Sequence, residues 1–247
     1  MMALWIYGIN PVYEALRSDR CQIREVWVAE GRGPKGLEGI ISRAQSEKIP
    51  ISKVERSKLD SLTKNAPHQG VVGFIDQWAY ADLDEVFQGG EGEPFLLILD
   101  GIEDPRNLGA LIRTADACGV WGVIIPKDRA VGITPVVAKS SAGAVFHIPV
   151  VHVTNIPTTV RRIKERGIWV AGAAAEAQTD LYHNDLTVPL AVVIGGEGRG
   201  MRPLVKRECD LLISIPMKGK INSLNASVAG SIILYEVLRQ RGHTPHP

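Results

Sequence analysis

The chain has 247 residues, of which 45% are hydrophobic and 22% charged, ordinary values for a globular protein with a sizeable core. Its formal net charge of only +1 excludes a protein that coats nucleic acid by bulk charge. The three cysteines are far apart and form no CxxC pair, which argues against a disulfide framework or a zinc ribbon. We expect a cytoplasmic protein that does not enter the membrane, because residues 1–20 hold no apolar signal core and no apolar run has the length of a membrane helix.

Residues 1–76 alternate between short strands and helices. Strands are predicted at residues 4–8, 23–30 and 70–75, and helices at residues 10–18 and 36–48. The first helix is indicated by Pro11 after a possible Asn10 cap, followed by apolar residues at helical spacing. These elements predict a small α/β domain.

Residues 77–94 have the composition of a linker. They hold five acidic residues and no basic one, and they end in GGEGEP, which disfavours regular structure. The flanking segments carry net charges of +2 over residues 1–76 and +4 over residues 95–247. We therefore predict two mildly basic domains, 1–76 and 95–247, that bind polyanions only through local patches.

Residues 95–247 contain continuous apolar runs, which are typical of parallel strands covered on both faces. Strands are predicted at residues 95–100, 121–126, 146–151, 168–173, 190–195 and 211–216. Helices are expected at 107–118, at about 155–166 and at 223–240. This order predicts a doubly wound α/β layout with a mostly parallel sheet.

The first candidate site follows the strand 95–100, because ligands of open parallel sheets bind beyond the carboxyl ends of the strands. Asn107 is placed to cap the next helix, and Arg113 lies opposite the apolar stripe of that helix. Two interpretations stay open. These residues are a cap and a solvated cation, or they form an anion site in which Arg113 reaches a phosphate or a developing oxyanion.

The second candidate site is the glycine-rich segment 195–200, GGEGRG. Its glycines allow either a turn with positive φ or a close approach of the backbone to a ligand. Glu197 is equally consistent with a solvated acid and with a partner of Arg113 or of a ligand. The segment is neither a Walker A loop nor a GxGxxG fingerprint. Residues 196–200 do match the GxGxG of Rossmann-like methyltransferases, but they follow the fifth strand, where that fold does not place it.

The third candidate site is the polar segment after strand 211–216. Asn222 or Ser223 is expected to cap the last helix, but a cap alone does not account for Ser223 and Asn225 at a strand's carboxyl end. From Ala226 onward, small residues permit close packing of another backbone. The histidines show no metal-ligand spacing, so no metal site is expected.

Three segments together resemble motifs 1, 2 and 3 of the SpoU/TrmH family of RNA 2′-O-methyltransferases, in order and spacing. They are NLGALIRTADACG, VVIGGEGRGM and ISIPMKGKINSLNASVA. The N-terminal YGINPVYEAL and HQGVVGF resemble the substrate-binding extension of the family's bacterial 23S rRNA guanosine-2′-O-methyltransferases. Three positions depart from the common pattern: Gly196 stands where alanine is common, Asn222 where serine is common, and Ala226 where valine is common.

The resemblance implies a fold, a cofactor and an assembly. The fold is a SPOUT domain, with a C-terminal trefoil knot around a mostly parallel sheet, and a small N-terminal L30e-like α/β domain that binds RNA. The family works as homodimers and holds S-adenosylmethionine in the knot. By motif, the catalytic residues are Asn107, Arg113, Glu197, Ser223 and Asn225. The cofactor-binding positions are Gly195, Gly196, Glu197, Gly198, Ile215, Met217, Leu224 and Asn225.

The reaction implied is S-adenosylmethionine-dependent methylation of a guanosine 2′-hydroxyl in 23S rRNA, in the peptidyl-transferase region. A tRNA 2′-O-methyltransferase and a non-catalytic RNA-binding homologue are the alternatives. Because an arginine titrates far above neutral pH, we favour Arg113 as an electrostatic stabiliser rather than as a base.

Overall fold

The computed structural model describes residues 4–31, 36–78 and 80–242. Packing divides the chain into two units. The first comprises Met1–Ala79 and Ile133–His147, and the second comprises Tyr80–Gly132 and Ile148–Pro247. No helix in the described ranges is long and apolar enough to cross a membrane.

The first unit contains a four-stranded sheet in the order β1-β4-β2-β3. Strands β1 and β2 pair antiparallel with β4, while β2 and β3 are parallel. The strands are β1 (Leu4–Tyr7), β2 (Ile23–Ala29), β3 (Ile51–Val54) and β4 (Val71–Ile75), and the helices are α1 (Ile9–Arg17), α2 (Leu37–Ser46) and α3 (Arg56–Thr63). The predicted elements of this region are confirmed, but β3 and α3 were not predicted, because β3 has only four residues and α3 is mostly polar.

Residues 133–147 pack within the first unit although they come from the second half of the sequence. They form α5 (Pro135–Ser140) and the 3₁₀ helix η2 (Ala144–Phe146). Ser18 Oγ donates a hydrogen bond to the carbonyl of Phe146, and His147 Nε2 lies 2.8 Å from Glu14 Oε2. This segment was predicted to belong to the domain of residues 95–247, whereas its packing joins it to α1. The boundaries at 76 and 95 remain predictions.

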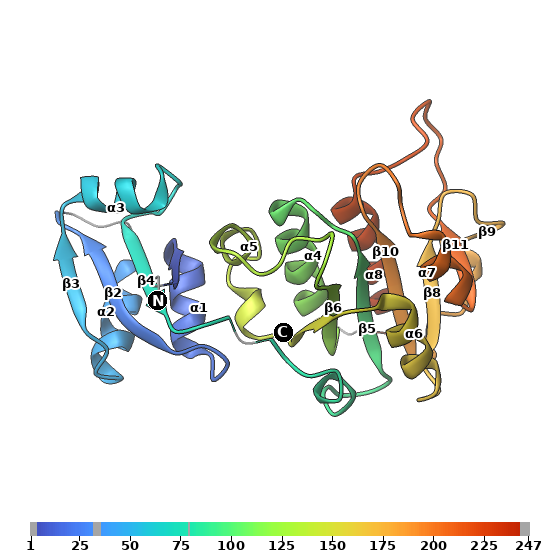
Figure 1. Cartoon of the computed structure of the whole chain (residues 1–247), viewed down its shortest axis with the longest axis horizontal. Helices are drawn as coiled ribbons and strands as arrows, with labels where there is room; N and C mark the ends of the chain where they lie inside the picture. Colours follow the sequence, from blue (N-terminus) through green and yellow to red (C-terminus); the bar gives the residue numbers. More distant parts are fainter. Residues whose placement is uncertain (1–3, 32–35, 79, 243–247) are drawn as a thin grey trace. The chain divides into compact units, whose positions relative to one another are not determined.

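The second unit contains a seven-stranded parallel sheet in the order β7-β6-β5-β10-β8-β11-β9 (Figure 1). Its strands are β5 (Phe95–Asp100), β6 (Gly122–Pro126), β7 (Val150–Val153), β8 (Trp169–Ala173), β9 (Thr179–Asp180), β10 (Leu190–Gly195) and β11 (Leu211–Ser214). The mostly parallel α/β sheet is therefore confirmed. The bounds of β5 and β10 agree with the prediction at both ends.

One strand prediction is displaced. Residues 146–151 were expected to be a strand, but β7 begins only at Val150. Pro149 has no N–H to give to a sheet, so pairing starts after it. The apolar residues before it are buried in η2 and in the following turn instead.

Helices cover both faces of the large sheet, as the doubly wound prediction requires. On one face, α6 (Ile156–Lys164) and α7 (Pro203–Glu208) share a core with alternate residues of the central strands. On the other, α4 (Pro105–Ala117) and α8 (Ala226–Gln240) pack together over β10. A Cβ on Gly230 would lie 2.3 Å from Leu111 Cδ2 and 3.4 Å from Ile194 Cγ1, so α8 uses its small residues for close packing. Two further 3₁₀ turns are η1 (Glu85–Phe87) and η3 (Leu181–His183).

Asp100, the last residue of β5, holds the chain that follows β10. Its carboxylate is buried and accepts hydrogen bonds from the backbone N–H and the Nε–H of Arg202, both at 2.7 Å. The Asp100 carbonyl also accepts a hydrogen bond from Gly196 N at 2.9 Å. Both ends of the glycine-rich segment are thus fixed to β5.

We predict that Asp100→Asn destabilises the protein. The amide replaces one acceptor by an N–H that faces the donors of Arg202, and hydrogen bonds to a charged group contribute about 2 kcal/mol. A loss of this size lowers Tm by roughly 4–8 °C, which thermal unfolding measures. Asp128→Asn is the control, because Asp128 is exposed and has no hydrogen bond or ion pair within the described chain. Equal melting temperatures for the two variants would contradict the role of Asp100.

Candidate active site

Three segments meet at the carboxyl edge of the parallel sheet. Residues 101–104 follow β5, residues 196–202 follow β10, and residues 215–225 follow β11. Each contains residues that the sequence analysis selected or that lie directly beside them.

Asn107, Glu197 and Asn225 form one hydrogen-bonded group, which we call the polar cluster. Asn107 Nδ2 donates to Glu197 Oε1 at 2.6 Å, and Asn225 Nδ2 donates to Asn107 Oδ1 at 3.1 Å. The backbone N–H of Glu103 donates to Glu197 Oε2 at 3.2 Å. Because these bonds join residues about a hundred positions apart, the fold itself builds the cluster.

The helix caps differ from the prediction. Asp104, not Asn107, caps α4 and accepts a hydrogen bond from Arg106 N at 2.7 Å. Asn225, not Asn222 or Ser223, caps α8 and accepts one from Ser227 N at 2.9 Å. The Pro105 ring fixes the first helical position of α4, so the helix starts before Asn107. The Asn107 amide is therefore available to the polar cluster.

Arg113 lies outside the polar cluster. It is six residues beyond Asn107 on α4, which in a helix is about 9 Å along the axis and roughly 240° around it. Its side chain is exposed and makes no hydrogen bond or ion pair with any residue that the structure describes. Glu197 accepts hydrogen bonds from Asn107 and from the Glu103 N–H, so in the described chain its partners do not include Arg113.

The glycines of segment 195–200 allow the backbone of this segment to pass close to other backbone segments. A Cβ on Gly195 would lie 2.1 Å from Met201 N, and a Cβ on Gly196 would lie 2.0 Å from the carbonyl oxygen of Gly101. Gly198 has φ +80°, a conformation that side chains disfavour. The glycines therefore fold the segment back onto itself and onto β5, where Glu197 reaches Asn107.

A cavity of about 590 Å³ lies between the end of β8, the end of β11 and the start of α8. Of the predicted residues, Ile215, Met217, Ser223 and Leu224 line it. Gly195, Gly196, Glu197, Gly198 and Asn225 are not among its lining residues. The predicted site therefore divides into a cavity and the adjoining polar cluster, and Leu224–Asn225 links the two.

The cavity suits a small molecule with both apolar and polar parts. Its volume falls within the range of about 300–1,000 Å³ that is typical of ligand sites. Ile213, Ile215 and Ile233 supply apolar surface, while Ser214 and Asn222 supply hydrogen-bonding groups. A nucleoside-containing cofactor such as S-adenosylmethionine fits this combination.

One wall of the cavity was not predicted from the sequence. Ala173 ends β8 and Ala174–Glu176 directly follow it, and all four residues line the cavity together with the segment after β11. Small residues at the end of a predicted parallel strand were a usable signal, because the same rule selected the other three segments.

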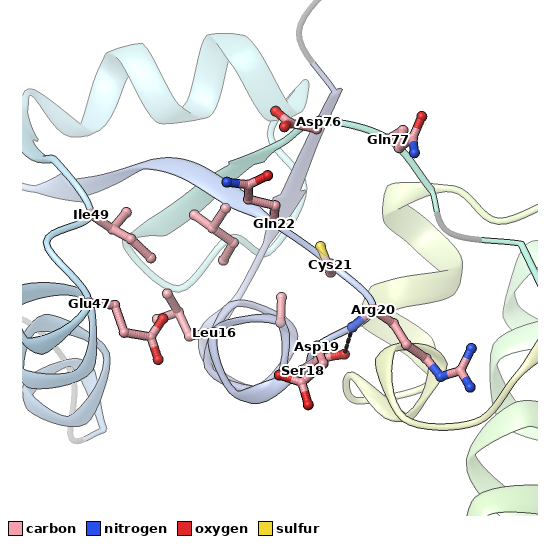
Figure 2. A pocket seen from close by; sticks show the side chains of 12 residues that line it. Leu16, Ser18, Asp19, Arg20, Cys21, Gln22, Glu47, Ile49, Asp76 and Gln77 are labelled. Atoms are coloured by element: carbon pink, nitrogen blue, oxygen red, sulfur yellow. Dashed lines mark hydrogen bonds between the residues drawn. The ribbon is translucent and has the colours of Figure 1, made fainter.

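A second cavity, of about 540 Å³, lies within the first unit between the end of α1, the start of β2 and the end of β4 (Figure 2). Leu16 and Ile49 provide apolar lining, and Gln22, Asp76 and Gln77 provide polar groups. Cys21 also lines it, but burial raises the pKa of this thiol to about 11, so it is protonated at neutral pH.

The other two thiols, Cys118 and Cys209, are also protonated at neutral pH. Burial raises the pKa of Cys118 to about 11 and that of Cys209 to about 12. In the described part of the chain, no three His, Cys, Asp or Glu side chains are grouped to hold a metal ion.

Two family models match the sequence. Residues 94–235 match the SpoU rRNA methylase family, and residues 5–81 match the substrate-binding domain of RNA 2′-O-ribose methyltransferases. Together, the two family models cover most of the residues of both units.

Named relatives match over nearly the whole chain. A Bacillus subtilis protein named as a TrmH family tRNA/rRNA methyltransferase, YacO, is 48% identical over 96% of each chain. The 23S rRNA (guanosine-2′-O-)-methyltransferase RlmB of Pseudomonas syringae is 42% identical over 98% of each chain.

A solved structure is similar throughout. The SpoU methyltransferase AviRb of Streptomyces viridochromogenes, in complex with the cofactor AdoMet, superposes with a TM-score of 0.81 at 27% identity. The match covers 97% of this chain and 90% of AviRb. With a family model over more than half of its residues and relatives over nearly all of them, the chain belongs to the SpoU rRNA methylase family of RNA methyltransferases.

Proposed function

We propose that this protein transfers a methyl group from S-adenosylmethionine to the 2′-hydroxyl of a guanosine in 23S rRNA, in the cytoplasm. The observation that carries the proposal is the polar cluster of Asn107, Glu197 and Asn225 beside the cavity of Ile215 and Leu224. The name of the RlmB relative and the substrate-binding model over residues 5–81 support rRNA as the substrate.

The polar cluster is suited to orient a ribose. When bound, S-adenosylmethionine supplies an activated methyl group, so the protein has to align and polarise the hydroxyl. Glu197 is held by Asn107 and by the Glu103 N–H, which fixes both of its oxygens as acceptors. Rigid acceptors and amides of this kind position a hydroxyl without large rearrangement. Ser223, which lines the cavity next to the cluster, contributes a further hydroxyl.

Arg113 serves as the cation of the reaction in this proposal. Its guanidinium has no internal partner in the described chain, so it is available to an RNA phosphate or to the developing alkoxide. The very high pKa of an arginine disfavours its use as a general base.

We expect Arg113→Ala to lower methyl transfer to rRNA by at least about a hundredfold, as the loss of one stabilising group at a reacting oxyanion does. S-adenosylmethionine affinity should stay near the wild-type value, because Arg113 does not line the cavity. Tritium transfer and calorimetric titration measure the two quantities. Arg207→Ala, on the exposed part of α7, is the matched control. Equal loss of cofactor binding would refute this division of roles.

The cavity is the proposed cofactor site, with Ile215, Met217 and Leu224 against the ligand and Gly195–Gly198 shaping the adjoining loop. Leu224→Trp should weaken S-adenosylmethionine binding at least about tenfold, because a larger side chain fills the cavity. Ile221→Trp is the control, since Ile221 belongs to the same segment, is 70% exposed and does not line the cavity. Unchanged affinity in Leu224→Trp, measured by calorimetry, would place the cofactor elsewhere.

We also propose that the chain forms homodimers and has the family's trefoil knot near its C-terminus. Family membership supports both. For the dimer, Val228 and Tyr235 are seven residues apart on one face of α8, and they are 47% and 54% exposed. An exposed apolar stripe on a helix is typical of an interaction surface.

Replacement of both residues, Val228→Asp with Tyr235→Asp, should convert the dimer to a monomer, because two carboxylates would be buried in each half of the interface. Light scattering after size exclusion measures the mass. The control is Trp169→Asp, a 53% exposed aromatic residue on β8. A dimer that persists in the double variant would exclude this face of α8.

A tRNA is the second candidate substrate, and the name of the YacO relative as a tRNA/rRNA methyltransferase favours it. A non-catalytic RNA-binding protein is less well supported, because the polar cluster and Arg113 are all present. Mapping of the 2′-O-methyl groups that disappear from rRNA and tRNA when the gene is deleted distinguishes the three. Loss of one rRNA guanosine methyl is the outcome that the proposal expects.

A further inference from the structure

A stacked aromatic pair lies at the β7 edge of the large sheet. The ring centroids of Tyr80 and His152 are 3.9 Å apart, and the ring planes meet at 12°. His152 is opposite Ile125 in the register of β6 and β7, and Ala81 forms a parallel bridge with Val151. Both rings are half-buried, so part of their surface faces solvent.

The loop Lys127–Gly132 connects this pair to the candidate active site. Both ends of the loop lie near the pair, because Lys127 N donates to the Val153 carbonyl at 2.8 Å and a Cβ on Gly132 would lie 2.9 Å from the Tyr80 hydroxyl. Between these ends, Val131 N donates to the Ile102 carbonyl at 2.9 Å. Because Ile102 follows β5 and precedes α4, the loop reaches from the rings to the segment that leads into the polar cluster.

Two cations project from this loop. Lys127 and Arg129 are exposed, and neither has an ion pair in the described part of the chain. Arg129 has φ +56°, an uncommon conformation for a residue with a side chain, and its carbonyl lies 3.5 Å from where a Cβ on Gly101 would be. Asp128 between them is the one acidic group of the loop.

A cavity of about 320 Å³ adjoins His152, between β7, the segment Ala81–Leu83 and the first turns of α6. Asp82 and Arg162 both line this cavity, so the cavity carries charges of both signs. Arg162 is also partly neutralised, because its Nη2 lies 3.6 Å from Asp84 Oδ1. Burial, and secondarily the Lys127 ammonium, lower the pKa of His152, which keeps the ring neutral at neutral pH. The cavity is therefore better suited to a base than to a phosphate.

We infer that the Tyr80–His152 pair and its cavity bind an unpaired RNA base that flanks the methylated nucleotide, while Lys127 and Arg129 bind the phosphates between the two. Stacking on aromatic rings combined with cations along the backbone is how proteins hold single-stranded RNA. Neighbouring strands are about 4.8 Å apart, so β7 lies roughly 10 Å from β5, a distance that suits a flanking position. This inference rests on the proposed function, because it assumes an RNA substrate.

The test measures binding of an unmodified 23S rRNA transcript at several salt concentrations. His152→Ala should weaken binding about 5- to 150-fold, the effect of removing one stacked base. His152→Phe should stay within about twofold of wild type, because it restores the aromatic face. Lys127→Ala with Arg129→Ala should reduce the slope of log K against log salt by about 1.4, that is, about 0.7 for each phosphate that the variant no longer neutralises. Arg207→Ala, at the end of α7, should change neither quantity.

Wild-type affinity in His152→Ala, or equal weakening in His152→Ala and His152→Phe, would overturn the inference, and so would an unchanged salt slope in the double variant. S-adenosylmethionine affinity is measured for every variant and should equal that of wild type, and thermal unfolding verifies that each variant is folded at the temperature of the binding assay. If the wild-type protein methylates the transcript while these variants bind it normally, only this inference fails. If wild-type protein does not methylate RNA, the proposed function fails.

Discussion

The candidate active site depends on the hydrogen bonds by which Asp100 fixes the segment that follows β10. Its carbonyl accepts from Gly196 N and its carboxylate accepts from Arg202, so both ends of the intervening segment are fixed. A Cβ at 195 or 196 would come within about 2 Å of the backbones of Met201 and Gly101, so a larger residue at either position requires the backbone to shift. With the ends fixed, Glu197 is presented to Asn107, and Asn107 in turn to Asn225.

Much of the fold could be predicted from apolar patterning. Runs such as FLLILD and LAVVIG are apolar throughout because helices cover them on both faces, and their bounds were predicted at both ends. The packing of residues 133–147 could not be predicted, because their partners lie on α1, more than a hundred positions away. A fragment that starts at residue 95 would expose Val137 and Ala138, which are fully buried in the whole chain.

The candidate site, too, could be predicted where it depends on local sequence pattern, but not where it depends on contacts between distant residues. The rule that ligands lie beyond the carboxyl ends of parallel strands selected Asn107, Glu197 and Asn225 before any contact between them was known. The caps of α4 and α8 were predicted wrongly, because a cap depends on where the helix begins. For α4, Pro105 at the first helical position sets that start. Asp100 was not selected, since its buried position opposite Arg202 is visible only once the sheet is assembled.

Asn225 has two roles that a simple loss of activity would not separate. Its Oδ1 accepts from Ser227 N to cap α8, while its Nδ2 donates to Asn107 in the polar cluster. Its neighbour Leu224 lines the cavity, so two adjacent residues connect the proposed cofactor site, the proposed ribose site and the start of the last helix. Arg113, by contrast, supports none of these structures. Its removal therefore reports on RNA binding and the reaction rather than on the structure of the site, which makes it the sharper probe of the proposed chemistry.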